Sequence, residues 1–356
     1  MTAFFSYAIL YIVQRKRKKE RNVYFRTALF YGGALADLTQ YNIGSFFAGV
    51  GGIELGFKQA GFSDPVYANE FDKWAQVTYQ TNWTNTALDP SDIRTVNPKD
   101  TPDMDIIMGG FPCQAFSIAG KQLGFNDIRG TMFFEMMRFV QEKQPQVLFA
   151  ENVKNLQSHD GGTTFQVICE ILKELGYTVR FKVMNAKDYG NIPQNRERIY
   201  IIAFKDSDKA TRFNFPSSIP LTFGIRDVID FENPQEEQYY YSKTKYKSEM
   251  MDILERDMDD KDAIYQWRRT YVRKNKSGVV PTLTANQGTG GHNVCLVRTD
   301  DNRIRKMTPR ECFNTQGFPQ DFILPQIANC HLYKQAGNSV CVPVVKRIAE
   351  NIALVL

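Results

Sequence analysis

Short apolar runs alternate with amphipathic stretches through the first two-thirds of the chain. The runs have the length of buried strands and are soon followed by glycine or an acidic residue; they span 43–47, 65–68, 105–107 and 147–150. Between them, apolar residues recur at helical spacing in 53–60, 131–143 and 162–175. Strands that alternate with helices in this way predict an α/β fold whose sheet carries helices on both faces.

The pattern then changes twice. Residues 177–184 and 198–204 are predicted to be strands that pair antiparallel at the sheet edge, which makes the sheet mixed. Beyond Pro216 the chain is polar with weak periodicity, which indicates a smaller, irregular and mostly β domain. We expect an extension, a large domain, this smaller domain and a C-terminal segment that returns to the large domain, over residues 1–39, 40–215, 216–327 and 328–356.

The formal net charge of +5 has a local origin. Residues 15–21 hold six basic residues and one acid and account for all of it, so the rest of the chain has zero net charge. Within that remainder, residues 263–310 hold ten Lys and Arg against two Asp, a net charge of +8. Such a segment suits a phosphate backbone, although an ordinary solvated basic face has the same composition.

Cysteine and histidine usage indicates no metal site. None of the six cysteines forms a C-x-x-C pair, and the three histidines lack ligand spacing. We therefore expect free thiols in a reducing cytoplasm. The apolar stretch 3–13 is too short to span a bilayer, and basic residues follow it instead of preceding it as in a signal peptide. Residues 1–39 are predicted to be an amphipathic or poorly ordered extension without a membrane partner.

Cys113 lies on a predicted loop. It follows a strand that we expect Gly109 and Gly110 to end, and the carboxyl end of a strand is where open α/β sheets bind ligands. A thiolate there can act as a nucleophile, although a lone cysteine is more often a buried structural residue. Glu151 ends the next buried strand, so it could be an acid or base beside the thiolate, or cap the following helix.

Two arginines enter a later strand. Arg196 and Arg198 are two residues apart, so we expect their side chains to point the same way. They could bind a phosphate or a base carbonyl, or form a surface ion pair with Glu197.

The turn 47–52, rich in glycine, joins a strand to a helix. This is typical of a nucleotide-binding βα unit, although it matches neither the dinucleotide nor the P-loop pattern. Glu70, 21 residues after Gly49, could accept hydrogen bonds from ribose hydroxyls, or only favour a helix N-terminus. Phe71 could stack on an adenine, and Asp92 and Ile93 could contact its edge or form only a turn.

Two polar loops are the last candidate binding segments. Residues 114–130, rich in glycine, are predicted to close over a substrate. Residues 281–291 can offer hydroxyls and amides to phosphates and base edges, or form an ordinary flexible loop.

Six of these stretches occur in a family's order between residues 42 and 356: 47–52, 110–114, 151–153, 194–198, 310–312 and 337–340. In them the chain resembles the cytosine-C5 DNA methyltransferases of bacterial or phage restriction–modification systems. The resemblance implies a Rossmann-like S-adenosylmethionine-dependent methyltransferase fold. It also implies a target-recognition region over 216–305, whose recurring signature matches Thr282 and Leu283.

The resemblance implies a DNA (cytosine-5-)-methyltransferase that transfers a methyl group from S-adenosyl-L-methionine to C5 of a flipped-out cytosine. Cys113 would add to C6 of the base, and Glu151 would hydrogen-bond or protonate N3. Arg198 would hold the exocyclic O2, and Arg196 would order the thiolate or a nearby phosphate.

The family's binding residues carry over position by position. Cofactor contacts would come from Phe47, Gly49, Gly51, Glu70, Phe71, Asp92, Ile93, Pro112, Met132, Asn338, Ser339 and Val340. DNA contacts would come from Gln114, Ser117, Arg129, Arg268, Arg269, Arg273, Thr282 and Leu283. Ser45 stands where the family has an acid, which leaves one contact to the methionine end of the cofactor unassigned.

We expect a monomer that acts on double-stranded DNA in the bacterial cytoplasm, at the nucleoid, with a restriction endonuclease acting independently. One alternative is a tRNA cytosine-C5 methyltransferase on the same domain, which the large recognition region disfavours. The other is a non-catalytic DNA-binding protein on this scaffold, which Cys113, Glu151, Arg196 and Arg198 together disfavour.

Overall fold

The structure is a computed structural model that describes residues 37–112, 131–268, 270–287 and 293–356. Nearly all of the expected extension, the loop 114–130 and part of the polar loop 281–291 lie outside these residues.

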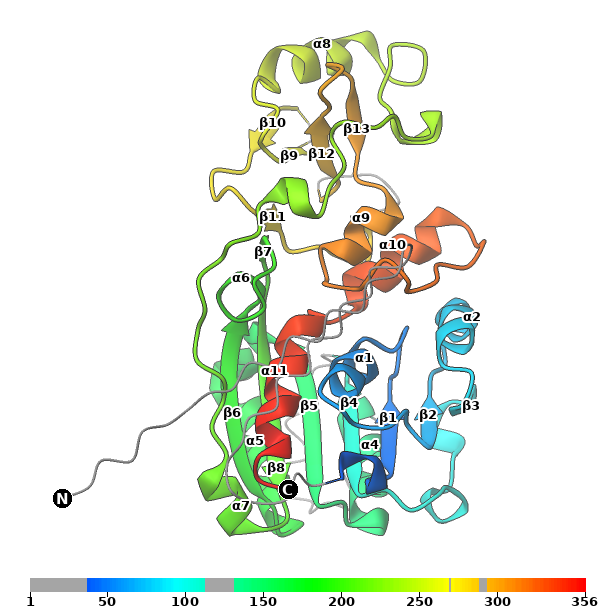
Figure 1. The fold of residues 1–356 in the computed structure, drawn as a ribbon, viewed down its shortest axis with the longest axis vertical. Helices are drawn as coiled ribbons and strands as arrows, with labels where there is room; N and C mark the ends of the chain where they lie inside the picture. Colours follow the sequence, from blue (N-terminus) through cyan, green and yellow to red (C-terminus); the bar gives the residue numbers. More distant parts are fainter. Residues whose placement is uncertain (1–36, 113–130, 269, 288–292) are drawn as a thin grey trace, which may run out of the picture. The chain divides into compact units, whose positions relative to one another are not determined.

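A seven-stranded mixed sheet forms the centre of the larger part (Figure 1). Its order is β3-β2-β1-β4-β5-β8-β6. The strands are β1 (Ile43–Phe46), β2 (Tyr67–Asn69), β3 (Ala87–Asp89), β4 (Ile106–Gly110), β5 (Val147–Val153), β6 (Thr178–Asn185) and β8 (Glu197–Phe204). The strands β1 to β5 run parallel, and β8 runs antiparallel to both β5 and β6. The predicted mixed sheet is confirmed.

The chain reverses its direction across the sheet beside β1. It adds β2 and β3 on one side of β1 and then returns to place β4 on the other side. In an open α/β sheet the carboxyl ends of the strands leave a crevice at such a switch point, where ligands bind. The topology therefore directs attention to the loops that follow β1 and β4.

Helices cover both faces of the sheet, as predicted. On one face α1 (Gly52–Gln59) packs against α11 (Val342–Ala353) over β5 side chains such as Val147 and Phe149. On the other face α4 (Met132–Lys143) and α5 (Thr163–Glu174) cover Leu148 and Ala150. Because alternate residues of a strand face opposite sides, a strand buried on both faces appears as a continuous apolar run.

One predicted strand end is wrong. Gly109 and Gly110 do not end β4 but continue it, pairing with Ala150 and Glu151 of β5. The backbone of a neighbouring strand comes very close here, since a Cβ on Gly109 would lie 2.7 Å from the carbonyl oxygen of Phe46. Glycine is therefore needed at this point for close packing between strands and not for a turn.

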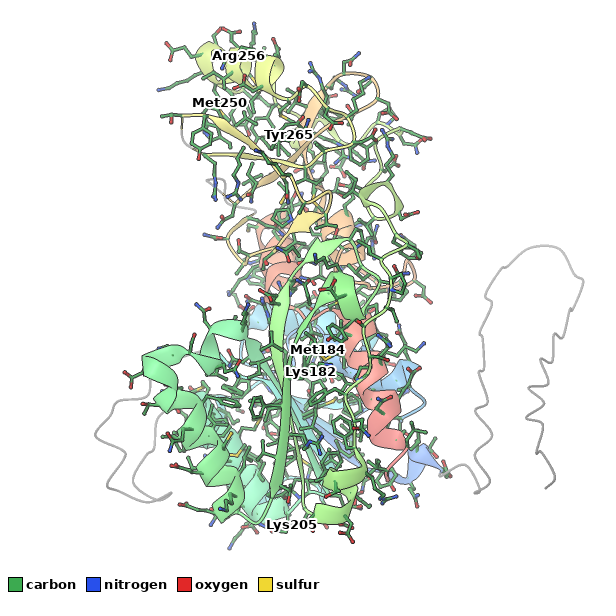
Figure 2. The ribbon with its side chains drawn as sticks, turned by 90° about the vertical axis from the view of Figure 1, so that its left-hand side faces the viewer. Lys182, Met184, Lys205, Met250, Arg256 and Tyr265 are labelled. Carbon is green, nitrogen blue, oxygen red and sulfur yellow. The ribbon has the colours of Figure 1, made fainter. Side chains whose placement is uncertain are left out.

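A smaller antiparallel sheet forms the second part, with the order β10-β9-β12-β13. Its strands are β9 (Tyr265–Trp267), β10 (Val272–Lys274), β12 (Cys295–Arg298) and β13 (Ile304–Lys306). The helix α8 (Ser248–Asp257) covers it through Met251 and Leu254. Figure 2 shows α8 with Met250 and Arg256, and Tyr265 of β9 beside it. The same figure shows Lys182 and Met184 on β6, the edge strand of the larger sheet.

The two sheets are joined by a short parallel pair, β7 (Gln194–Asn195) with β11 (Val280–Pro281) (Figure 1). The remaining α-helices are α2 (Lys73–Asn82), α6 (Ala186–Tyr189), α7 (Ser207–Arg212), α9 (Pro309–Asn314) and α10 (Asn329–Asn338). Short 3-10 helices are η1 (Leu38–Gln40), η2 (Ile93–Thr95), η3 (Pro98–Asp100), η5 (Lys154–Gln157), η6 (His159–Gly162), η7 (Ile225–Asp227) and η8 (Glu237–Tyr239).

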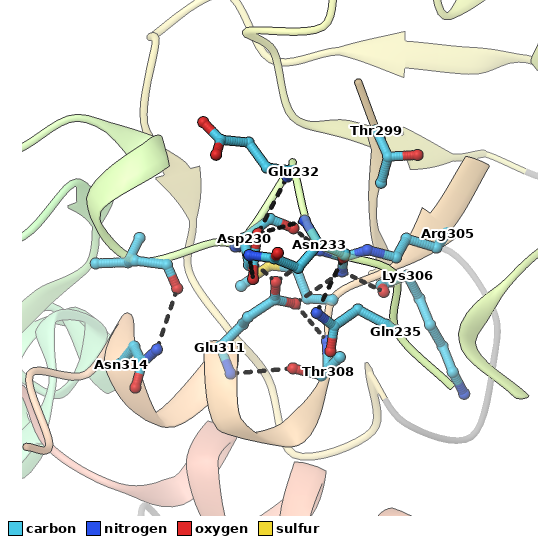
Figure 3. Close-up of polar contacts among 12 residues, drawn as sticks. Asp230, Glu232, Asn233, Gln235, Thr299, Arg305, Lys306, Thr308, Glu311 and Asn314 are labelled. Carbon is cyan, nitrogen blue, oxygen red and sulfur yellow. Dashed lines mark hydrogen bonds and ion pairs between the residues drawn. The ribbon is translucent and has the colours of Figure 1, made fainter. Parts of the chain in front are cut away.

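A buried ion pair fixes α9 against the smaller sheet (Figure 3). The guanidinium of Arg305, fully buried, donates to both carboxylate oxygens of Glu311 at 2.8 and 2.7 Å. Glu311 also accepts the N–H groups of Thr308 and Asp230, and Thr308 caps α9 in return. The carboxylate is thus shared by β13, α9 and the segment at Asp230, so the pair holds three stretches of chain together.

Two searches of the described residues gave a negative result. No helix among them is long and apolar enough to cross a membrane. No group of three or more His, Cys, Asp and Glu side chains among them could hold a metal ion.

The substitution Glu311→Ala should destabilise the protein by about 3–5 kcal/mol, because it leaves the Arg305 charge buried without a partner. Urea unfolding would measure this loss. As a control, Asp252→Ala removes an exposed ion pair with Lys243 and should cost less than about 1 kcal/mol. Equal losses in the two variants would contradict the importance of the buried pair.

Candidate active site

A cavity of about 400 Å³ opens at the carboxyl ends of the strands around the switch point. Its wall is formed by the turn after β1, the residues after β2, the ends of β4 and β5, two arginines near the start of β8, and the end of α10. The lining residues are 47–50, 52–53, 70, 72, 75, 110–112, 151–153, 196, 198, 334–335 and 337–340.

The cavity contains many of the side chains that the sequence singled out. Phe47, Gly49, Glu70, Pro112, Glu151, Arg196, Arg198, Asn338, Ser339 and Val340 all line it. Five other expected cofactor residues, Gly51, Phe71, Asp92, Ile93 and Met132, do not line it. Cys113, Gln114, Ser117, Arg129 and Arg269 lie outside the described residues.

The turn after β1 requires glycine. Gly49 and Gly51 have φ angles of +58° and +88°, in the left-handed region that other residues rarely adopt. A Cβ on Gly51 would collide with the indole of Trp83 at 1.9 Å, whereas a Cβ on Gly49 would meet no atom within 4 Å. The turn is therefore tightly packed behind Gly51 and leaves open space at Gly49, on the cavity wall.

Glu70 is fixed at the end of β2 by the backbone. One carboxylate oxygen accepts the N–H of Gly49 at 2.8 Å, and the other accepts the N–H of Asp72 at 2.6 Å. Burial nevertheless raises the pKa of Glu70. The two N–H groups hold the carboxylate in one orientation on the cavity wall.

Three further residues expected to contact the cofactor do not line the cavity. The ring of Phe71 is 70% exposed. Asp92 caps η2 through the N–H of Arg94 and forms an ion pair with its guanidinium. Ile93 is buried in the core that covers one face of the sheet. The cofactor contacts expected of these three residues stay predictions.

Ser45 has an acidic partner that sequence reasoning missed. Its hydroxyl donates a hydrogen bond of 2.6 Å to Glu54 in the first turn of α1, and both side chains are buried. Burial raises the pKa of Glu54 to about 7. The second carboxylate oxygen has no hydrogen-bond partner among the described residues. Ser45 is thus bonded to a carboxyl of α1, and neither side chain lines the cavity.

A buried carboxyl and an arginine meet at the other end of the cavity. The Nε of Arg198 lies 3.1 Å from Oε1 of Glu151, and both side chains are nearly buried. Burial raises the pKa of Glu151, although Arg198 and Arg196 act in the opposite direction. Gly110 leaves room for this carboxyl, since its Cβ would lie 3.3 Å from Oε2.

Asn152 fixes the chain just before Cys113. Its side-chain amide donates to the carbonyl oxygen of Phe111 at 2.8 Å, and both groups are buried. Pro112 follows on the cavity wall. The last described residue before the cysteine is therefore held next to Glu151. Asn152 was missed as a separate candidate because its function is to support a backbone group.

The terminal nitrogens of Arg196 have backbone carbonyl groups as partners. They donate to Leu283 at 3.0 Å, to Gly337 at 3.0 Å and to Ser339 at 2.5 Å. The side chain is buried, and burial lowers its pKa to about 9. Arg196 and Arg198 line one cavity, but their terminal groups have different partners.

Most of the basic residues in 263–310 are engaged inside the protein. Arg305 is fully buried, Lys274 pairs with Asp259 and Asp260, and Arg303 pairs with Asp301 and Glu237. Arg298 and Arg310 donate to backbone carbonyls. At least these five of the ten basic residues therefore have partners within the protein.

The expected DNA-contacting residues are in varied positions. Arg273 is exposed on β10 and donates to the buried side chain of Gln266. Arg268 is partly exposed, just after β9. The hydroxyl of Thr282 donates to Asn195 at 2.6 Å, and Leu283 is buried.

The fold, with its sheet order and the cavity at the carboxyl ends of its strands, defines an α/β protein of the Rossmann-like class. Comparison with known proteins shows which family within this class the chain resembles. The family model described as C-5 cytosine-specific DNA methylase matches residues 41–354. The chain is 55% identical over 311 residues to the Type II methyltransferase M.Bsp6I of Bacillus sp. (strain RFL6), which covers 87% of this chain and 98% of that protein.

Another relative and a solved structure are also similar to this chain. The chain is 39% identical over 332 residues to the Type II methyltransferase M.HhaI of Haemophilus parahaemolyticus, with 88% and 95% of the two chains covered. Among solved structures, a DNMT2 mutant of Spodoptera frugiperda has a TM-score of 0.67 at 18% identity, over 88% of this chain and 99% of that one. This last likeness concerns the fold. The chain belongs to the C-5 cytosine-specific DNA methylase family.

The buried acid Glu54 predicts a pH-dependent stability. Its pKa is raised from 4.5 to about 7, so its contribution to stability is full below pH 4.5 and is lost as the pH rises through 7. The shift corresponds to about 3 kcal/mol. Glu54→Gln keeps the acceptor for Ser45 but cannot ionise, so its Tm relative to the wild type should rise from pH 5 to pH 8.

Thermal unfolding at both pH values checks this. Glu174→Gln, at an exposed position of α5, is the matched control and should give the same difference from wild type at both pH values. A pH-independent effect of Glu54→Gln would refute the assignment.

Proposed function

We propose that this protein transfers a methyl group from S-adenosyl-L-methionine to C5 of a cytosine in a specific duplex DNA sequence, as part of a restriction–modification system. The observation that carries the proposal is a single cavity that joins the glycine turn, Glu70, Pro112 and the Glu151–Arg198 pair. A nucleoside-binding end and an acid–arginine end thus share one space.

The residues at the glycine turn fit S-adenosylmethionine. The carboxylate of Glu70 lines the cavity with both oxygens oriented by backbone N–H groups, and it would hold the ribose hydroxyls. The open space at Gly49 lets the backbone approach the ligand. Asn338, Ser339 and Val340 would close the cavity from the α10 side. When bound, the cofactor supplies an electrophilic methyl group.

Glu151 is suited to act on N3 of the base. Its raised pKa, caused by burial, favours the protonated form that can donate to N3 when a nucleophile adds to the ring. Arg198, 3.1 Å away, orients the carboxyl and presents donors that would hold the exocyclic O2. The two residues would thus stabilise charge on the base from adjacent strands.

Cys113 would supply the nucleophile. A bond from its sulfur to C6 makes C5 of the base electron-rich, and C5 then takes up the methyl group. Loss of the C5 proton to water and of the thiolate from C6 restores the aromatic ring. Addition needs access to the face of the ring, so the cytosine must leave the base stack.

DNA with 5-fluorocytosine at the target position should trap a covalent complex, because the fluorine at C5 cannot leave as a proton. The target is found by bisulfite sequencing of DNA from cells that express the protein. The complex would appear as a slower band on a denaturing gel. Cys113→Ser should form none while still binding S-adenosylmethionine, and loss of cofactor binding in this variant would argue against a purely chemical role.

Glu151→Gln should lower kcat by about 10²–10⁴-fold, because the amide cannot supply the proton. Methyl transfer at saturating DNA and cofactor measures this. Glu197→Gln is the matched control on the adjacent strand β8, where the acid forms an exposed ion pair with Lys154, and kcat should change little. Similar kcat values for Glu151→Gln and wild type would remove Glu151 from the mechanism.

The substrate class is tested separately. Incubation with labelled S-adenosylmethionine should label duplex DNA and leave tRNA unlabelled. Labelling of tRNA alone would overturn the proposal of a DNA substrate and retain the chemistry.

A further inference from the structure

Arg196 lies where three functional stretches of chain meet. It sits between β7, which pairs with β11 of the recognition region, and β8, which carries Arg198 (Figure 1). Its own N–H donates to Asn185 at 3.1 Å, so its backbone is fixed at this junction. The three carbonyls that its side chain contacts come from Leu283, Gly337 and Ser339, at least 87 residues away along the chain.

These acceptors belong to two different binding surfaces. Gly337 and Ser339 flank Asn338, and all three line the cofactor cavity. Leu283 follows Thr282, whose hydroxyl is bound to Asn195. One buried guanidinium therefore contacts the wall of the cavity and the recognition segment 282–285 at the same time.

The two surfaces are packed closely against each other at Gly337. A Cβ on Gly337 would lie 2.3 Å from the carbonyl carbon of Thr284, so the last turn of α10 presses directly on the backbone of the recognition segment. The hydrogen-bond acceptors of the Arg196 guanidinium among the described residues are these three carbonyls, and Glu151 also acts on its charge electrostatically. Displacing one of the carbonyls would leave buried donors unsatisfied.

We propose that Arg196 is a positioning residue that couples the two binding sites, so that occupation of the cofactor cavity orders the recognition segment 282–285 and binding at that segment strengthens cofactor binding. This rests on the proposed function of the cavity. A cofactor that fixes Asn338 fixes the carbonyls on either side of it, and Arg196 transmits this restraint to Leu283. By linkage, the effect is reciprocal.

Hydrogen exchange of the full-length protein tests the coupling without knowledge of the DNA target. The probe is S-adenosylhomocysteine, and the readout is the protection of the amides in 282–287. In the wild type, saturating probe should raise their protection about tenfold. In Arg196→Lys, which keeps the charge but loses the planar set of donors, the probe should still bind and the protection should not change.

Arg347→Lys is the matched control. Arg347 on α11 also donates to two distant backbone carbonyls, of Tyr189 and Ser217, but it does not line the cavity. The wild-type response should persist in this variant. If Arg196→Lys does not fold, Thr282→Val removes only the hydroxyl bond to Asn195 and should reduce the response.

The outcomes are distinguishable. If calorimetry shows no binding of S-adenosylhomocysteine to the wild type, the proposed function fails and the coupling with it. If the probe binds the wild type without protecting 282–287, or protects them equally in Arg196→Lys, the proposed function stands and the coupling is overturned.

Discussion

The register between β5 and β8 is the constraint that brings Glu151 and Arg198 together at the cavity. Val153 pairs with Arg198 and Glu151 pairs with Tyr200, so the acid and the arginine lie two residues apart on adjacent antiparallel strands. A shift by one residue would turn one of the two side chains to the opposite face of the sheet. The apolar residues on both faces of β5 and β8 prevent such a shift, because they are divided between two separate cores. Hydrophobic packing on the strands thus determines where two charges meet.

Buried ionisable side chains are accommodated in this protein in three different ways. Arg305 is neutralised by a carboxylate that also serves a helix cap and a backbone N–H. Arg196 is surrounded by carbonyl dipoles and remains a cation at some cost. Glu54 and Glu151 have raised pKa values because their surroundings favour the protonated acid. The buried ion pair thus holds three stretches of chain together, whereas the two acids avoid the cost of a buried charge by favouring the protonated form.

The sequence predicted the central strands well because a strand covered on both faces has an uninterrupted apolar run, as at 147–150. It did not predict β3, which has three residues and is partly exposed at the sheet edge. Gly109 and Gly110 were misinterpreted because glycine marks a turn and a close approach of backbones equally well. Basic residues could be counted along the chain, but their partners could not be foreseen: Arg303 pairs with Glu237, 66 residues earlier. Glu54 was missed for the same reason, since only the fold shows that Ser45 lies next to it.

One wall of the cavity is built from residues 334–340, far along the chain from the glycine turn and beyond the recognition region. During synthesis the ribosome makes the wall at the glycine turn early and the wall at residues 334–340 only near the end. A nascent chain that stops before residue 334 has no enclosed space between the two, so it cannot retain a small ligand there. The order of synthesis therefore completes the cavity only after the smaller antiparallel sheet has been made.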